Sequence, residues 1–113
     1  MMLQTLKSDN KIETIFEKGF LVKEGDFFLK AYDFNDDETL FGVSVSKRFF
    51  KSAVIRNKLK RRMRESVRKN PRINEIKKGA SFFLIYNTSK EHSYKAIDEK
   101  ICNLVDKLIS KIN

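Results

Sequence analysis

A dense cluster of basic side chains between residues 47 and 69 is the part of the sequence best equipped for chemistry. The segment KRFFKSAVIRNKLKRRMRESVRK holds eleven Lys or Arg residues and a single acid, Glu65. The whole chain carries a net charge of +9, so the remainder is close to neutral. Charge concentrated in this way is typical of a surface that binds a polyanion such as nucleic acid. The alternative is a solvated helix face, which the mutual repulsion of so many cations disfavours.

Residue types that support catalysis or metal binding are otherwise scarce. The single histidine, His92, and the single cysteine, Cys102, argue against a Ser-His-Asp triad, a multi-cysteine zinc site and an internal disulfide. The acids are not clustered as two-metal nucleases require, so we expect no metal site in the protein. Residues 36–38 are interpreted as a solvated acidic turn. We expect His92 to be an exposed loop residue and Cys102 a small core residue.

Length and composition indicate one globular domain spanning residues 1–113. The chain has 113 residues and is 41% hydrophobic, which suffices for a modest core. No apolar run approaches the roughly 18–20 residues that a membrane helix needs. The first ten residues lack the apolar stretch of a secretory signal. We therefore expect a cytoplasmic protein with a negatively charged partner and no membrane association.

Local patterns predict an α+β protein in which helices and strands follow the order αβββαβα. Ser8, Asp9 or Asn10 can cap the first helix, Gly19 is expected to end it, and Ser93 is expected to cap the last helix. The expected elements are a helix over 8–19, strands over 20–32 with a turn at 24–26, a strand over 39–46, a helix over 52–69, a strand over 81–86 and a helix after residue 93.

The third strand and the second helix each present two chemically different faces. Residues 39–46 alternate, so that Phe41, Val43 and Val45 share an apolar face while Gly, Ser and Ser occupy the other. A face of small polar groups suits a groove. The helix places Ile55, Leu59, Met63 and Val67 on one stripe, and most of its cations lie opposite that stripe.

Two linked motifs resemble a known family. Residues 56–64 read R-N-x-L-K-R-x-x-R, and residues 42–48, directly before this helix, read G-V-S-V-S-K-R. Together they resemble the signature of the bacterial ribonuclease P protein component. LKSDNKIETIFEKG at 6–19 resembles that family's opening helix, and GASFFLIYN at 79–87 resembles its late strand. The resemblance spans essentially the whole chain.

The resemblance implies both a fold and a function. The implied fold is a two-layer α/β sandwich similar to ribosomal protein S5 domain 2, with a left-handed β-α-β crossover. The implied role is that of a non-catalytic subunit that partners a large catalytic RNA. The RNA holds Mg²⁺ and removes the 5′ leader of precursor tRNA, while the protein positions substrate and broadens its range. The implied partners are the catalytic RNA and the leader, and no DNA.

By the same resemblance, residues of this sequence can be assigned to the two RNAs. The residues expected to bind the catalytic RNA are Lys47, Arg48, Lys51, Arg56, Asn57, Lys58, Lys60, Arg61, Arg64 and Arg68. The residues expected to line the leader cleft are Ile12, Phe16, Phe28, Lys30 and Ser44. Lys58 replaces the commoner arginine of the family and lacks its guanidinium fork.

Several alternatives stay open at this point. Phe16 and Phe28 are as well explained by a core as by a cleft. A ribosomal-protein-like RNA-binding module shares the basicity and size of this chain, but would have no role in tRNA processing. A protein-only nuclease is the third reading, and the shortage of histidine and of clustered carboxylates speaks against it.

Overall fold

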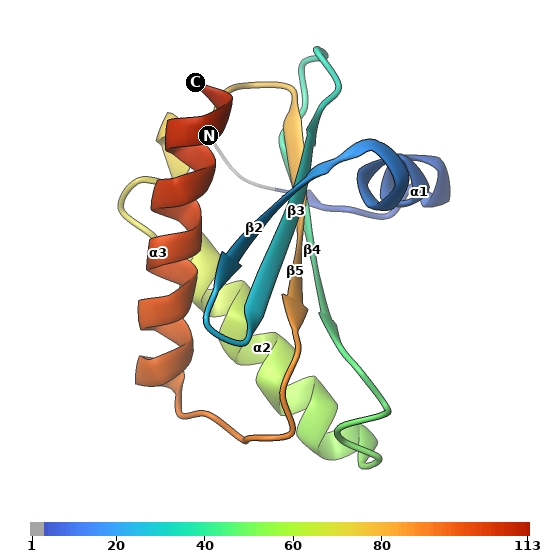
Figure 1. The fold of residues 1–113 in the computed structure, drawn as a ribbon, viewed down its shortest axis with the longest axis vertical. Coiled ribbons are helices and arrows are strands. Elements are labelled where there is room, and N and C mark those ends of the chain that lie inside the picture. The colour runs from blue at the N-terminus through green and yellow to red at the C-terminus, as the bar shows by residue number, and fades with distance from the viewer. Residues whose placement is uncertain (1–3) are drawn as a thin grey trace.

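Alternating apolar side chains build the centre of the molecule, a five-stranded sheet with the strand order β1-β4-β5-β3-β2. The computed structural model describes residues 4–113 (Figure 1). β4 lies parallel to β1 and β5, whereas β3 is antiparallel to β2 and β5. The elements are β1 (Gln4–Thr5), α1 (Asp9–Lys18), β2 (Phe20–Glu24), β3 (Phe27–Asp33), β4 (Leu40–Val45), α2 (Ala53–Lys69), a 3₁₀ helix (Ile73–Glu75), β5 (Ala80–Tyr86) and α3 (Tyr94–Ile112).

The helix starts follow the capping residues in the sequence. Ser8, Ser52 and Ser93 each accept a hydrogen bond from the backbone N–H three residues on. This satisfies one of the free donors at each helix start.

The α+β class and the expected helices and strands are confirmed, but the expected order omits β1 and the 3₁₀ helix. β1 is only two residues long and forms by pairing with Leu40 and Phe41, far along the chain.

Gly19 ends α1 for a reason other than a left-handed turn. Its φ is −70°, a value open to any residue. A Cβ at this position would lie 2.3 Å from the carbonyl oxygen of Ile15 and 2.7 Å from that of Ala31. The chain therefore passes too close to β3 for a side chain, and only glycine lets α1 pack there.

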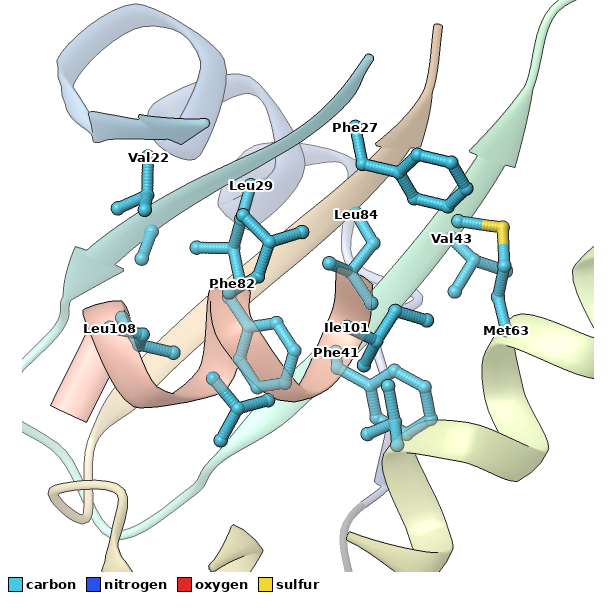
Figure 2. Packing of buried hydrophobic residues seen from close by; sticks show 14 of the residues in the cluster. Val22, Phe27, Leu29, Phe41, Val43, Met63, Phe82, Leu84, Ile101 and Leu108 are labelled. Atoms are coloured by element: carbon cyan, nitrogen blue, oxygen red, sulfur yellow. The ribbon is translucent and has the colours of Figure 1, made fainter. Parts of the chain in front are cut away.

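The main core lies between one face of the sheet and helices α2 and α3 (Figure 2). The apolar stripe expected on α2 is confirmed, since Leu59, Met63 and Val67 are fully buried. The apolar face of β4 is confirmed as well. The side chains labelled in the close-up view come from the sheet and from both α2 and α3: Val22, Phe27, Leu29, Phe41, Val43, Met63, Phe82, Leu84, Ile101 and Leu108.

The other face of the sheet is only partly covered. Helix α1 lies on the side opposite α2 and α3 (Figure 1) and buries a second, small cluster of Leu6, Ile15 and Leu40. The sheet with α2 and α3 is the expected two-layer sandwich, and α1 adds a partial third layer. The connection β4–α2–β5 joins parallel neighbours, and its left-handed sense stays a prediction. Within residues 4–113, no helix combines the length and hydropathy needed to cross a membrane.

Candidate nucleic-acid interface

Most charged residues of helix α2 lie opposite its buried apolar stripe, although Val54 in the first turn is exposed. Asn57, Arg61 and Arg68 are exposed and Lys60 and Arg64 half-buried on the side away from the core. The first turn contains no acid, so nothing offsets the partial positive charge at the helix start. In the part of the chain that the structure describes, Arg61 has no carboxylate within ion-pair distance. This side of α2 is therefore strongly positive.

The turn that precedes α2, residues 46–51, is called the basic turn below. Ser46 anchors one end, because its carbonyl accepts from the backbone N–H groups of Phe49 and Phe50 at 3.2 and 3.1 Å. Its Oγ accepts from the Arg48 N–H at 3.1 Å. The guanidinium carbon of Arg48 lies 5.3 Å from the Phe49 ring centre, and Lys47, Arg48 and Lys51 are all exposed. The turn adds three cations at the start of α2.

Arg56 lies differently from the other predicted RNA ligands. Its Nη1 donates to the carbonyl oxygens of Phe50 at 2.8 Å and Lys51 at 2.9 Å. Both acceptors belong to the basic turn. The part of the side chain expected to meet RNA is thus bound to protein backbone.

Two further cations of α2 bind the loop that precedes α3. Lys58 forms an ion pair with Glu91, and the hydrogen bond from Lys58 lowers the pKa of that carboxyl. Arg62 Nη1 donates to the carbonyl oxygen of His92 at 2.8 Å. Lys58 thus has a carboxylate partner within the protein, although it belongs to the predicted RNA-binding set.

His92 is not the exposed loop residue expected from the sequence. Its side chain is 12% exposed and lies against the rings of Phe27 and Tyr86, with centroid separations of 5.7 and 6.0 Å. The Tyr86 hydroxyl accepts from the His92 backbone N–H at 2.8 Å. Cys102 is partly buried, and desolvation raises the pKa of its thiol. Among residues 4–113, no three His, Cys, Asp or Glu side chains come together as a metal site.

On the partly covered face of the sheet, Phe16 and Lys30 come together where α1 ends. Phe16 is 39% exposed, and its ring centre lies 5.2 Å from that of Phe83. Lys30 Nζ donates to the Phe16 carbonyl oxygen at 2.7 Å. Lys30 therefore satisfies a free carbonyl in the last turn of α1 as well as adding charge. Phe83 in turn lies over Gly42 of β4.

Beyond α1, the uncovered part of the same face carries a row of side chains across four strands. This row, called the open row below, consists of Lys23, Phe28, Ile85 and Ser44. Register pairs Lys23 with Phe28, Phe28 with Ile85 and Ile85 with Ser44. Phe28, Ile85 and Ser44 are half-buried and Lys23 is exposed, with its Nζ 5.5 Å from the Phe28 ring centre. Ser44 lies two residues before Ser46, so the open row ends at the basic turn.

The predicted leader residues therefore divide into three groups. Phe28 and Ser44 lie in the open row, whereas Phe16, near the end of α1, and Lys30, which binds its carbonyl oxygen, lie beside the row. Ile12 instead packs against the small cluster of Leu6, Ile15 and Leu40.

Lys23, Phe83 and Ile85 were not predicted as part of this surface. Residues 82–86 are all apolar, so the sequence does not show that Phe83 and Ile85 share the less buried face of this strand. The sequence carried no signal for this face, because the pairing of Phe83 with Lys30 and of Ile85 with Phe28 is set by the register of the sheet.

Comparison with known proteins relates the whole chain to one family. A sequence model of the family described as Ribonuclease P matches residues 2–109. The Ribonuclease P protein component of Clostridium kluyveri is 29% identical over 108 residues, covering 95% of this chain and 96% of that protein. Its namesake from Clostridium botulinum is 46% identical over 67 residues, so this match spans 58% of this chain and only 59% of that relative.

Solved structures show the same fold. The RNase P protein from Thermotoga maritima superposes with a TM-score of 0.78 at 28% identity, covering 92% of this chain and 96% of that one. The RNase P protein from Staphylococcus aureus gives a TM-score of 0.71 at 21% identity, covering 96% and 95%, a likeness of fold.

Proposed function

The chain belongs to the ribonuclease P protein family, and on that premise we propose that it is the protein subunit of a ribonuclease P. In this role it binds a catalytic RNA and the 5′ leader of precursor tRNA in the cytoplasm. Mg²⁺ held by the RNA supplies the hydrolytic chemistry. The protein itself is non-catalytic: it positions the leader, neutralises phosphates and broadens the range of substrates.

The positive side of α2 and the basic turn are the surface proposed for the catalytic RNA. Folded RNA packs phosphates closely, and a helix with exposed cations and no acid in its first turn complements them. Arg61 and Arg64 offer guanidinium groups that can bind phosphate in a bidentate manner. Asn57 is exposed and adds an amide that can bond a ribose hydroxyl or a base edge.

The open row is the surface proposed for the leader, and it is the observation that carries this proposal. A single strand presents unstacked bases and phosphates, which call for an aromatic face next to a cation. Phe28 and Lys23 supply that combination on an uncovered sheet face. Ser44 and Ile85 continue the row to the basic turn, so one RNA strand can pass from the sheet to the positive helix without a gap.

The test is cleavage of a precursor tRNA at low millimolar Mg²⁺ by a bacterial ribonuclease P RNA, with and without this protein. We expect correct cleavage to require both. Phe28→Ala should reduce the preference for leader-bearing over mature tRNA by about tenfold, because a stacked base contributes about 1–3 kcal/mol.

Phe20→Ala is the matched control. Phe20 is also half-buried on the same sheet beside a lysine, with Lys111 Nζ 5.2 Å from its ring centre, but it lies on the face covered by α3. It should leave the leader preference unchanged.

Other results would contradict the proposal. RNA binding without any leader preference would favour the ribosomal-type module, and cleavage by the protein alone would favour a protein-only nuclease.

A further inference from the structure

Arg56 binds the basic turn, which connects β4 to α2, through its side chain. It lies in the first turn of α2, and one nitrogen, Nη1, donates to two consecutive carbonyl oxygens, those of Phe50 and Lys51. Within the described residues, no backbone N–H bonds to either carbonyl. The guanidinium therefore satisfies acceptors that the backbone leaves free, and both donors of Nη1 are used.

Within residues 4–113, hydrogen bonds anchor the basic turn at two points. Ser46 holds its first half through three hydrogen bonds, to Arg48, Phe49 and Phe50. Arg56 holds its second half from the helix side. The Phe50 ring is buried against Tyr86, with 5.8 Å between ring centres, which fixes the middle of the turn to the core. Loss of Arg56 would leave the turn attached only through Ser46 and the Phe50 ring, so the segment that carries Lys47, Arg48 and Lys51 could shift relative to α2.

We propose that Arg56 serves RNA binding as a positioning residue, which fixes the basic turn so that its three cations meet the RNA together. This inference rests on the proposed function and assigns Arg56 a role different from that of Arg61. Arg61 is exposed on the same helix and has no carboxylate partner in the described chain, so it is free to contact a phosphate directly.

The two roles predict different couplings, which a pair of double-mutant cycles can separate. Affinity for a bacterial ribonuclease P RNA is measured as a function of salt for Arg56→Gln, Arg61→Gln, Arg48→Gln and the two double variants with Arg48→Gln. Each single variant removes one positive charge, so general electrostatics are matched. Arg48→Gln should weaken binding several-fold in the wild-type protein but change it by less than about twofold in the Arg56→Gln protein. In the Arg61→Gln protein it should keep its full effect.

The salt dependence gives a second, independent criterion. Arg61→Gln should reduce the slope of log Kd against log salt by about one, the value for one phosphate contact. Arg56→Gln should reduce it by more than one, because several cations lose their alignment. Additive cycles for both residues, with equal slope changes, would overturn the inference and make Arg56 a direct phosphate ligand.

Hydrogen exchange separates an effect of Arg56→Gln on the fold from an effect on the basic turn. Hydrogen exchange of the Arg48, Phe49 and Phe50 amides should accelerate in Arg56→Gln while the α3 amides keep their protection. Acceleration throughout the protein would instead mean that Arg56 only maintains the fold, which also overturns the inference. If the wild-type protein failed to bind the RNA, the proposed function itself would fall. Binding that Arg61→Gln weakens, together with an additive Arg56 cycle, would overturn only the positioning role.

Discussion

A side chain at position 42 is expected to destabilise the protein because of the aromatic ring that lies over Gly42. A Cβ built at this position would be 2.5 Å from Cε2, 2.8 Å from Cδ2 and 3.3 Å from Cζ of Phe83. Carbon atoms in contact are separated by about 3.5–4.0 Å, so Gly42→Ala must displace the ring by about 1 Å. The ring cannot move freely, since Phe16 packs on it with 5.2 Å between ring centres.

The size of the effect follows from two opposing contributions. Overpacking of this kind costs about 1–3 kcal/mol of unfolding free energy. Replacing glycine in a strand recovers roughly 0.5–1 kcal/mol, because alanine loses less conformational freedom on folding. Gly42→Ala should therefore destabilise the protein by about 1–2 kcal/mol. For a domain of this size, the melting temperature should fall by about 5 °C.

Thermal and urea unfolding of Gly42→Ala, Phe83→Ala and the double variant provide the assay. With the Phe83 ring removed, the methyl group of Gly42→Ala has room, and the substitution should be neutral or slightly stabilising. A loss of stability equal to that in the wild-type background would refute the reasoning, because the clash would then lie elsewhere. The same comparison explains in physical terms why a glycine begins the motif at 42–48.

Two further perturbations test the charged groups. Glu91→Gln frees Lys58 from its ion pair and should tighten binding of a ribonuclease P RNA by roughly two- to fivefold in filter binding. Glu65→Gln is the control, because it removes the same charge and frees Lys69 of α2, which is outside the predicted RNA-binding set. An equal shift in both variants would reveal a general charge effect. The hydrogen bond from Lys11 holds the pKa of Asp36 below its usual value. This interaction contributes fully to stability above the pKa that the Asp36 carboxyl has in the unfolded chain, and the contribution is lost as the pH falls through its lower pKa in the folded protein. Asp36→Asn should therefore lessen the fall in melting temperature between about pH 5 and pH 2. An unchanged pH profile would contradict this.

Local patterns in the sequence were enough to predict most of the fold. Serine caps, a 3.6-residue apolar stripe on α2 and the alternation of β4 are properties of neighbouring residues, and all three appear in the structure. The two-residue β1 could not be predicted, because it forms by pairing with a strand some 35 residues away. The family resemblance, carried by two motifs, is confirmed by the match over residues 2–109.

The candidate site was predicted less completely, because side-chain partners depend on tertiary contacts. Charge alone places Arg56 and Arg61 in one class, yet the first binds two carbonyls and the second is exposed. The partly exposed positions of β5, Phe83 and Ile85, were not predicted, because residues 82–86 are all apolar and do not show which of them lie on the uncovered face. His92 was expected to be exposed because nothing local signals the rings of Phe27 and Tyr86 that cover it.

The central position of β5 has a consequence for the order of events during synthesis. β5 is the last strand in the chain, yet it joins β3 on one side to β4 on the other, and these two strands do not pair with each other. Until residues 80–86 have left the ribosome, the sheet consists of two unconnected halves, and α2 emerges before its packing surface is complete. A nascent chain that ends before β5 has neither the complete open row nor the complete packing surface of the positive helix. The surfaces assigned to the two RNAs therefore form together, late in translation.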